Sequence, residues 1–153
     1  MSRALLYVLF QCVGGFIGAL GVLAIHSEKL SKLKVHHEAA LIGMFGTIKD
    51  PNNSLINSIV DQFIGSMLLM LAIVNIPGSK YKPVFVGCVL GALGLFQGTN
   101  GFAFNMARDL FPRIVSTIMY GSSPFEGYET WVWVPVVVPF MGTAFAMLIS
   151  HFN

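Results

Sequence analysis

The chain has 153 residues, of which 55% are hydrophobic and only 10% are charged. A soluble domain carries roughly 25% charged residues, so this chain has too few charges to keep a globular surface wetted. We therefore expect a lipid bilayer to be its solvent. The formal net charge of +2 comes without a dense basic stripe, so the composition gives no case for a nucleic-acid partner.

Four stretches are apolar enough to be read as membrane spans, each of which needs about 20 mainly apolar residues. We expect them at residues 5–25, 55–76, 83–98 and 131–150. Because backbone in lipid must satisfy its own hydrogen bonds, each span should be helical. The first has only Arg3 before it and no small-residue cleavage site after it, which favours a retained span over a signal peptide.

The polar segment His26–Ser54, between the first two spans, is predicted to be a solvated loop. Its adjacent pair His36 and His37 cannot both point at one metal from a regular element, and no carboxylate or thiolate cluster accompanies them. We therefore predict no metal site.

The cysteines, Cys12 and Cys88, lie inside apolar runs, where we read them as small buried hydrophobic residues rather than a disulfide.

Small and aromatic residues predict how the spans pack. Pairs four residues apart, at the spacing that lets membrane helices approach closely, are Gly14 with Gly18, Gly87 with Gly91, and Gly142 with Ala146. Aromatic residues typical of an interfacial belt are Tyr128, Trp131 and Trp133. Both patterns indicate a tightly packed bundle and carry no specific chemistry.

The stretch Gly98–Tyr120 is unusual for a membrane protein, because polar residues interrupt an apolar run that is too short to span. We predict a re-entrant half-helix at about residues 105–118, a structure that lipid tolerates only where it lines a cavity or is packed in protein. Asn105 would cap its first turn and keep amide hydrogens for a solute. A membrane-buried Arg108 suggests a functional site; the alternative is that it pairs with Asp109 or extends to the interface.

The run Asn105–Arg113 (NMARDLFPR) closely resembles the second Asn-Pro-Ala box of the aquaglyceroporins, which continues Arg-Asp-x-x-Pro-Arg/Lys. The resemblance covers nearly the whole chain in order and spacing. Segment 45–47 (FGT) is similar to the family's extracellular Phe-x-Thr loop. Gln11 with the glycines after it resembles the third transmembrane helix, 61–65 (DQFIG) the fourth, and 131–139 (WVWVPVVVP) the last.

The resemblance implies a role for each residue of the pore and selectivity site. Arg108 would be the arginine of the selectivity constriction, and Phe102 the aromatic side chain beside it. Asn105 would be the central hydrogen-bond donor. Asp109 is the mark of the glycerol-permeable branch of the family.

Backbone and supporting positions follow from the same resemblance. The carbonyls of Gly101, Phe102 and Ala103 would accept hydrogen bonds from solute hydroxyl groups. Gln62 would be a buried polar side chain that braces the loop, with Ser66 beside it. Met106 and Ala107 would complete the box.

Three positions depart from the family pattern. Met106 replaces the proline of the box, a residue that is pre-organised for the first helical turn. Phe111 stands where small residues are usual. Leu93 falls where the family tends to have a glycine that widens the pore, although Gly94 serves if the register slips by one.

The first two spans and the first half-helix are missing, so we expect a single partial domain over residues 1–153, from a truncated product or partial gene model.

The resemblance implies an all-α transmembrane, incomplete aquaporin-like bundle that passively conducts glycerol, small uncharged solutes and water. It would be a multi-pass protein of the plasma membrane, in a homo- or hetero-tetramer. We find no nucleophile–base pair, metal set or phosphate loop, so we predict no enzyme activity and no cofactor. The alternative is a non-conducting fragment that co-assembles with full-length channels and modulates them.

Lysine and arginine counts do not select an orientation. The family topology would place Arg3, Lys80 and Lys82 in the cytoplasm and segment 26–54 outside. That segment carries four lysines against those three residues: Lys29, Lys32, Lys34 and Lys49. The positive-inside rule therefore does not support the family orientation, which we keep as an expectation.

Overall fold

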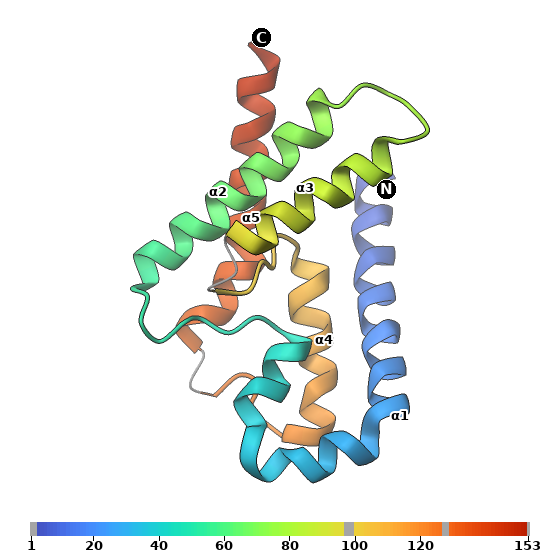
Figure 1. Ribbon diagram of the computed structural model, residues 1–153, viewed down its shortest axis with the longest axis vertical. Helices are drawn as coiled ribbons and strands as arrows, with labels where there is room; N and C mark the ends of the chain where they lie inside the picture. The colour runs from blue at the N-terminus through green and yellow to red at the C-terminus, as the bar shows by residue number, and fades with distance from the viewer. Residues whose placement is uncertain (1–2, 97–99, 127–128, 153) are drawn as a thin grey trace.

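The computed structural model describes residues 3–96, 100–126 and 129–152, with the side chains of residues 34–37 and 129–130 also outside the description. Five α-helices make up this part of the chain (Figure 1). They are α1 (Arg3–Phe45), α2 (Leu55–Asn75), α3 (Lys82–Phe96), α4 (Met106–Tyr120) and α5 (Glu129–His151). The prediction of an all-helical chain is confirmed.

Helix α1 continues for 43 residues through most of the polar segment that we predicted to be a loop, so that prediction is wrong for residues 26–45. No glycine or proline interrupts residues 22–42, and apolar residues recur there at helical spacing. Leu30, Leu41 and Ile42 are buried, at 3%, 5% and 2% exposure. Figure 1 shows that α1 is bent, turning across one end of the molecule after its long first part. The pair His36–His37 lies among the side chains outside the description.

Helix α1 packs mainly against α4. Their shared core combines buried residues of α1 with Val115 and Tyr120 of α4; those of α1 are Ala19, Leu30, Leu41, Ile42 and Phe45. Gly15 lets the two helices touch, because a Cβ atom placed on it would lie 2.5 Å from the Ala107 carbonyl oxygen. The start of α4 is therefore held directly against α1.

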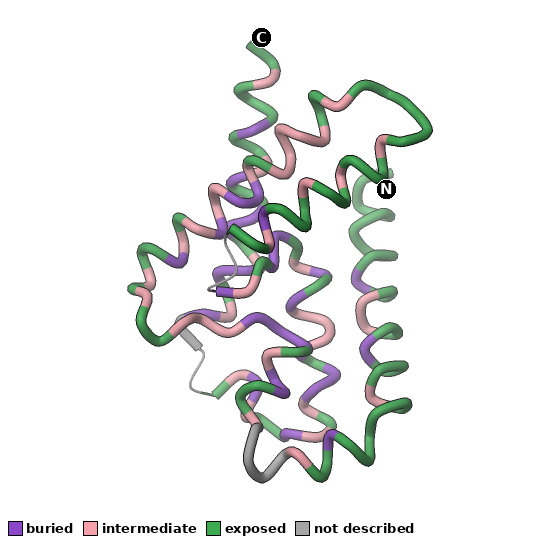
Figure 2. The backbone as a smooth tube through the Cα atoms, viewed as in Figure 1, coloured by how far each residue is buried: buried purple, intermediate pink, exposed green. Residues whose placement is uncertain are grey.

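Helix α2 packs mainly against α5. Trp131, Val134 and Val138 of α5 are buried, at 1%, 0% and 1% exposure, against the partly buried Leu55, Ile59 and Phe63 of α2. Gly142 makes the closest approach, since a Cβ there would overlap Ser66 Oγ and the Phe63 carbonyl oxygen. The bundle is thus two helix pairs, α1 with α4 and α2 with α5. Buried residues gather in the middle of the molecule, while the helix ends near the two termini are mostly exposed (Figure 2).

The predicted small-residue contacts are only partly right. Gly142 does face α2 at the helix contact, and Ala146, four residues on, is fully buried. By contrast, no described atom comes within 4 Å of a Cβ built on Gly14, Gly18, Gly87 or Gly91. Spacing alone could not tell which face of each helix meets a neighbour within the chain.

Within the part of the chain that the structure describes, three helical stretches are long and apolar enough to cross a membrane: Arg3–Leu33, Leu55–Asn75 and Trp131–His151. Helix α3 is a shorter apolar helix of 15 residues, about 22 Å long, and residues 97–98 of the span expected there lie outside the described residues. Most of its side chains are exposed, as apolar side chains facing lipid would be.

Candidate functional site

The first turn of α4 lies at the centre of the candidate site and is capped by Asn105. Asn105 has extended backbone angles, φ −155° and ψ 123°, and its side-chain oxygen accepts a hydrogen bond from the Ala107 N–H at 2.8 Å. This bond satisfies one of the backbone donors that every helix N-terminus leaves without a partner. The positive end of the helix dipole therefore lies beside Asn105.

The chain enters this helix through a strained turn. Gly101 has φ 64° and Phe104 has φ 48°. Glycine adopts such angles without strain, but a bulky residue rarely does. A residue held there costs about 1–3 kcal/mol and persists only when its surroundings hold it. Phe104 is buried at 8% exposure, so the packing around its side chain supports the backbone conformation that sets the direction of α4.

Gln62 of α2 is the side chain that braces this turn. It is fully buried, its amide donates to the Gly101 carbonyl oxygen at 3.4 Å, and its Oε1 accepts from the Phe104 N–H at 3.5 Å. The neighbouring Ser66 donates back to the Gln62 carbonyl oxygen at 2.7 Å. The family resemblance implies a bracing role for Gln62, and the two long hydrogen bonds indicate a loose brace that holds the turn at two points.

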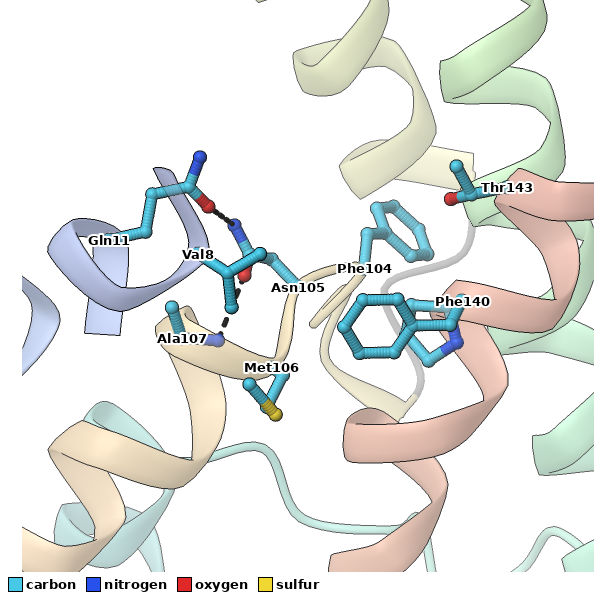
Figure 3. A pocket seen from close by; sticks show the side chains of 9 residues that line it. Val8, Gln11, Phe104, Asn105, Met106, Ala107, Phe140 and Thr143 are labelled. Carbon is cyan, nitrogen blue, oxygen red and sulfur yellow. Dashed lines mark hydrogen bonds between the residues drawn. The ribbon is translucent and has the colours of Figure 1, made fainter. Parts of the chain in front are cut away.

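A cavity of about 180 Å³ opens at the N-terminus of α4. Its wall comes from α1, the turn before α4 and α5 (Figure 3). Asn105 is exposed there and its amide reaches Gln11 Oε1 of α1 at 3.5 Å, while Met106 lies on the opposite side of the Asn105 backbone. The methionine that replaces the family's proline thus contributes a flexible thioether to the cavity wall.

Arg108, three residues after Asn105 in the first turn of α4, keeps 40% of its side chain exposed. Its Nη1 lies 3.9 Å from Asp109 Oδ2, which is beyond hydrogen-bond distance. It also lines a second hollow of about 260 Å³, beside Gly15 and Gly18 of α1 and Phe45. Pairing with Asp109, which the sequence left open, is therefore a long contact that leaves the guanidinium accessible.

Asp109 is fully buried and its partners lie elsewhere. Thr47 donates to Asp109 Oδ2 through both its N–H (2.6 Å) and its hydroxyl (2.5 Å). Arg113, also fully buried, donates to Asp109 Oδ1 from Nε at 3.2 Å and from Nη2 at 3.0 Å. Arg113 further donates to the carbonyl oxygens of Pro124, at 2.9 Å, and Thr47. The sequence analysis assigned a role to Asp109, but it quoted Thr47 and Arg113 only as parts of family motifs.

Trp131 belongs to the same network and not to an interfacial belt. It is only 1% exposed, and its indole N–H donates to the Thr47 carbonyl oxygen at 2.9 Å. The belt prediction is therefore wrong for Trp131, because a polar backbone group inside the protein gives its N–H a partner. Trp133 is 43% exposed, so its place in a belt stays a prediction, and Tyr128 lies outside the described residues.

Asn100 fastens the other side of the site, and sequence reasoning treated it only as part of a helix break. Its Oδ1 accepts from the Asp50 N–H and the Ser58 hydroxyl, each at 3.1 Å, and its amide donates to Asp61 Oδ2 at 3.2 Å. Because Asn100 is 1% exposed, these bonds tie the turn before α4 to segment 46–54 and α2. No local pattern marks such a residue.

The backbone from Gly101 to Ala103 runs between these anchors. Ala103 is buried, whereas the Phe102 ring is 39% exposed. A Cβ atom on Gly94 of α3 would lie 3.0 Å from that ring, so Gly94 makes room for Phe102. Leu93, which the resemblance places where the family tends to have a glycine, is buried at 8% exposure.

The site therefore joins exposed donors to backbone acceptors. Asn105 supplies amide hydrogens and Arg108 supplies a permanent cation with five fixed donors. The carbonyls of residues 101–103 lie on the chain that leads to them. Among the described residues, no group of three or more His, Cys, Asp or Glu side chains could hold a metal ion.

Fold and site together define a multi-pass helical membrane protein with a short capped helix that presents polar donors. The family comparison agrees: the family described as Major intrinsic protein matches residues 1–150. The chain belongs to this family, and the resemblance to aquaglyceroporins seen in the sequence is confirmed.

Three relatives illustrate the similarity. Aquaglyceroporin-3 of Trypanosoma brucei brucei is 29% identical over 95% of this chain and 52% of its own length. Human Aquaporin-9 is 31% identical over 94% and 53%. The glycerol uptake facilitator protein of Bacillus subtilis strain 168 is 33% identical over 91% and 52%.

A solved structure supports the fold. The X-ray structure of the aquaglyceroporin from Plasmodium falciparum matches with a TM-score of 0.81 and 28% identity, over 92% of this chain and 60% of that one. The chain thus spans about half the length of the curated relatives it matches. Its fold is an incomplete aquaporin-like bundle.

Proposed function

We propose that this chain supplies one half of the selectivity site of a passive channel for glycerol, similar small uncharged solutes and water. The observation that carries the proposal is that Asn105 and Arg108 are both exposed at the start of α4, in a family that includes glycerol facilitators. Helix α4 would be a re-entrant half-helix that ends inside the membrane and presents its N-terminus to the solute.

Solute selection would follow from hydrogen bonds to the protein that replace the water shell of the solute at a narrow point of the pore. A hydroxylated solute gives up its water shell, donates to carbonyls of residues 101–103 and accepts from Asn105 and Arg108. The Phe102 ring would face its carbon side. The Arg108 charge and the positive end of the α4 dipole both repel cations, so a neutral solute would pass and a proton would not.

The proposal extends to the cellular setting. The protein would lie in the plasma membrane, in a homo- or hetero-tetramer. Because the chain spans about half the length of its relatives, the remainder of the pore wall would come from sequence equivalent to their other half. That wall would cover the polar face that carries Gln11, Asn105 and Arg108, which lipid covers poorly.

A proteoliposome swelling assay tests the proposal. Vesicles carrying the chain at a fixed, measured density, reconstituted alone and together with the N-terminal half of a full-length aquaglyceroporin, are placed in a glycerol gradient, beside empty vesicles and vesicles with Arg108→Ala. We expect glycerol entry above that of empty vesicles when both halves are present, and a change on removing the guanidinium. Entry equal to that of empty vesicles in both preparations, and unaltered by Arg108→Ala, would overturn the proposal for this polypeptide.

A second candidate function is a non-conducting partner of full-length channels. The exposed polar residues on the face of α1 and α4, together with the apolar side chains around them, favour it because such a face needs protein against it. Co-expression with a full-length aquaglyceroporin discriminates between the two functions. Co-purification with reduced flux of the full-length channel supports the partner role. The absence of both effects argues against it.

A further inference from the structure

The carboxylate of Asp109 has its acceptor positions filled from two directions. A carboxylate offers about four lone-pair positions. Thr47 donates twice to Oδ2, at 2.6 and 2.5 Å, and Arg113 donates twice to Oδ1, at 3.2 and 3.0 Å. All three residues are at most 2% exposed, so water does not compete for these positions.

Arg108 lies directly beside this carboxylate. Its Nη1 is 3.9 Å from Asp109 Oδ2, and the two residues are neighbours in sequence. In a low-dielectric surrounding, a carboxylate without its other partners attracts such a cation strongly. Without the donors that hold it, the Asp109 carboxylate could close this 3.9 Å contact to a direct ion pair, and that pair would occupy donors of Arg108.

We propose that Arg113 and Thr47 are positioning residues that hold the Asp109 carboxylate away from Arg108 and so keep the Arg108 guanidinium available. The proposal rests on the proposed function, in which Arg108 donates to the solute. Arg113 is itself anchored by the Pro124 and Thr47 carbonyl oxygens, and Trp131 donates to that same Thr47 oxygen. The network therefore fixes the carboxylate from three parts of the chain.

Arginine-specific labelling reads the proposal directly, whether or not the chain conducts. The arginines of the chain are Arg3, Arg108 and Arg113. Phenylglyoxal should label the accessible Arg108, while the fully buried Arg113 is protected and the exposed Arg3 serves as the internal reference. Peptide mass spectrometry then gives the Arg108 to Arg3 labelling ratio for each detergent-solubilised variant.

Three substitutions separate the proposed role from general loosening. Thr47→Val removes one donor to Asp109 with little change of shape, and Arg113→Met removes two. Both should lower Arg108 labelling, the second by several-fold, because the released carboxylate pairs with Arg108. Asp109→Asn breaks the same network but leaves no anion to capture Arg108, so its labelling should stay at or above that of the unmodified chain.

The double variant Asp109→Leu/Arg113→Met should recover the labelling that Arg113→Met loses, since it removes the competing anion and its partner together. Equal Arg108 labelling in Thr47→Val, Arg113→Met and the unmodified chain would overturn the proposal. So would a change in the same direction for Arg113→Met and Asp109→Asn, because simple loosening of the network predicts that result.

Glycerol swelling of vesicles that carry the same proteins tests the proposed function separately from the positioning role of Arg113 and Thr47. Flux of the unmodified chain no higher than that of empty vesicles, both alone and with the N-terminal half of a full-length aquaglyceroporin, refutes the proposed function, while the labelling pattern still decides whether Asp109 is held away from Arg108. If the unmodified chain conducts, Arg113→Met should lower glycerol flux per folded protein toward that of Arg108→Ala, and Arg113→Lys should restore part of it. Full flux in Arg113→Met would contradict the positioning role.

Discussion

Trp131 donates its indole N–H to the Thr47 carbonyl oxygen at 2.9 Å, although 84 residues separate them in the sequence. Helix α5 begins two residues before Trp131, so this bond fastens the start of one helix to the segment that follows another. Thr47 is the residue that also holds the carboxylate of Asp109. The position of that carboxylate therefore depends on a side chain from the C-terminal part of the chain.

Replacing Trp131 by Phe should lower the free energy of unfolding by about 1 kcal/mol for the lost hydrogen bond, with a further loss from the cavity left in a buried site. The Thr47 carbonyl keeps the donation from Arg113, so it is not left without a partner. Thermal unfolding in detergent, followed by circular dichroism, measures the change. Trp133→Phe is the matched control at a 43% exposed position, and equal shifts in the two variants would contradict the assignment.

Gly15→Ala should destabilise the contact between α1 and α4. The new Cβ would lie 2.5 Å from the Ala107 carbonyl oxygen, so one helix must move. Overpacking of this kind costs about 1–3 kcal/mol. Gly14→Ala is the control, since no described atom lies within 4 Å of its Cβ and alanine is a better helix former than glycine.

We therefore expect a lower midpoint of thermal unfolding for Gly15→Ala and an unchanged or higher one for Gly14→Ala. The comparison uses adjacent residues of one helix, which cancels most effects of propensity. A Gly14→Ala variant that loses as much as Gly15→Ala would mean that α1 meets α4 through a different face.

Much of the helical layout could be predicted, because hydropathy and local capping signals act within one helix. The apolar runs coincide with helices, and Asn105 caps α4 as an Asn before an apolar run should. The continuation of α1 was missed because lysines and histidines lowered the hydropathy of residues 26–45. Yet the buried Leu30, Leu41 and Ile42 were already visible as a helical pattern.

The site itself was predictable only where a motif is local. Asn105, Arg108 and Asp109 lie within one run, but the partners of Asp109 depend on a contact with Thr47, 62 residues away. Asn100 likewise joins segments 39 to 50 residues apart. A polar residue in a loop carries no sign of the buried group it will meet, so tertiary packing had to supply these assignments.

Met106→Pro should stabilise the chain by about 0.4–1 kcal/mol. Met106 is the first residue of α4, where proline loses no needed donor, and the cap bond goes to the Ala107 N–H instead. Asn105, with φ −155° and ψ 123°, already has the extended conformation that a residue before proline prefers. Met106→Ala controls for loss of the thioether, and a Met106→Pro protein no more heat-stable than Met106→Ala would contradict the prediction.

Gln62→Met should loosen the turn before α4. The apolar side chain has similar length but leaves the Gly101 carbonyl and the Phe104 N–H without Gln62. An unsatisfied buried polar group costs about 1–3 kcal/mol, and Phe104 already holds a strained φ of 48°.

Hydrogen exchange of the peptide that covers residues 101–105 measures this loosening, and we expect faster exchange there than in the unmodified chain. Asn75→Leu is the control, because the Asn75 amide bonds within its own helix, to the Leu71 carbonyl oxygen, at an exposed site. Unchanged exchange at residues 101–105 in Gln62→Met would show that packing alone holds the turn.

Gly94→Ala tests whether the position of the Phe102 ring controls solute passage. The added Cβ would lie 3.0 to 3.2 Å from three atoms of the ring, so the ring must give way by a few tenths of an ångström. Phe102 is 39% exposed and can move without breaking the core, so thermal stability should change by less than about 1 kcal/mol. Glycerol flux should fall more than water flux, because the larger solute needs the width that the ring occupies.

Gly91→Ala is the matched control on the same helix, because no described atom lies within 4 Å of its Cβ. Equal glycerol-to-water flux ratios in the two variants would remove Phe102 from the selectivity site.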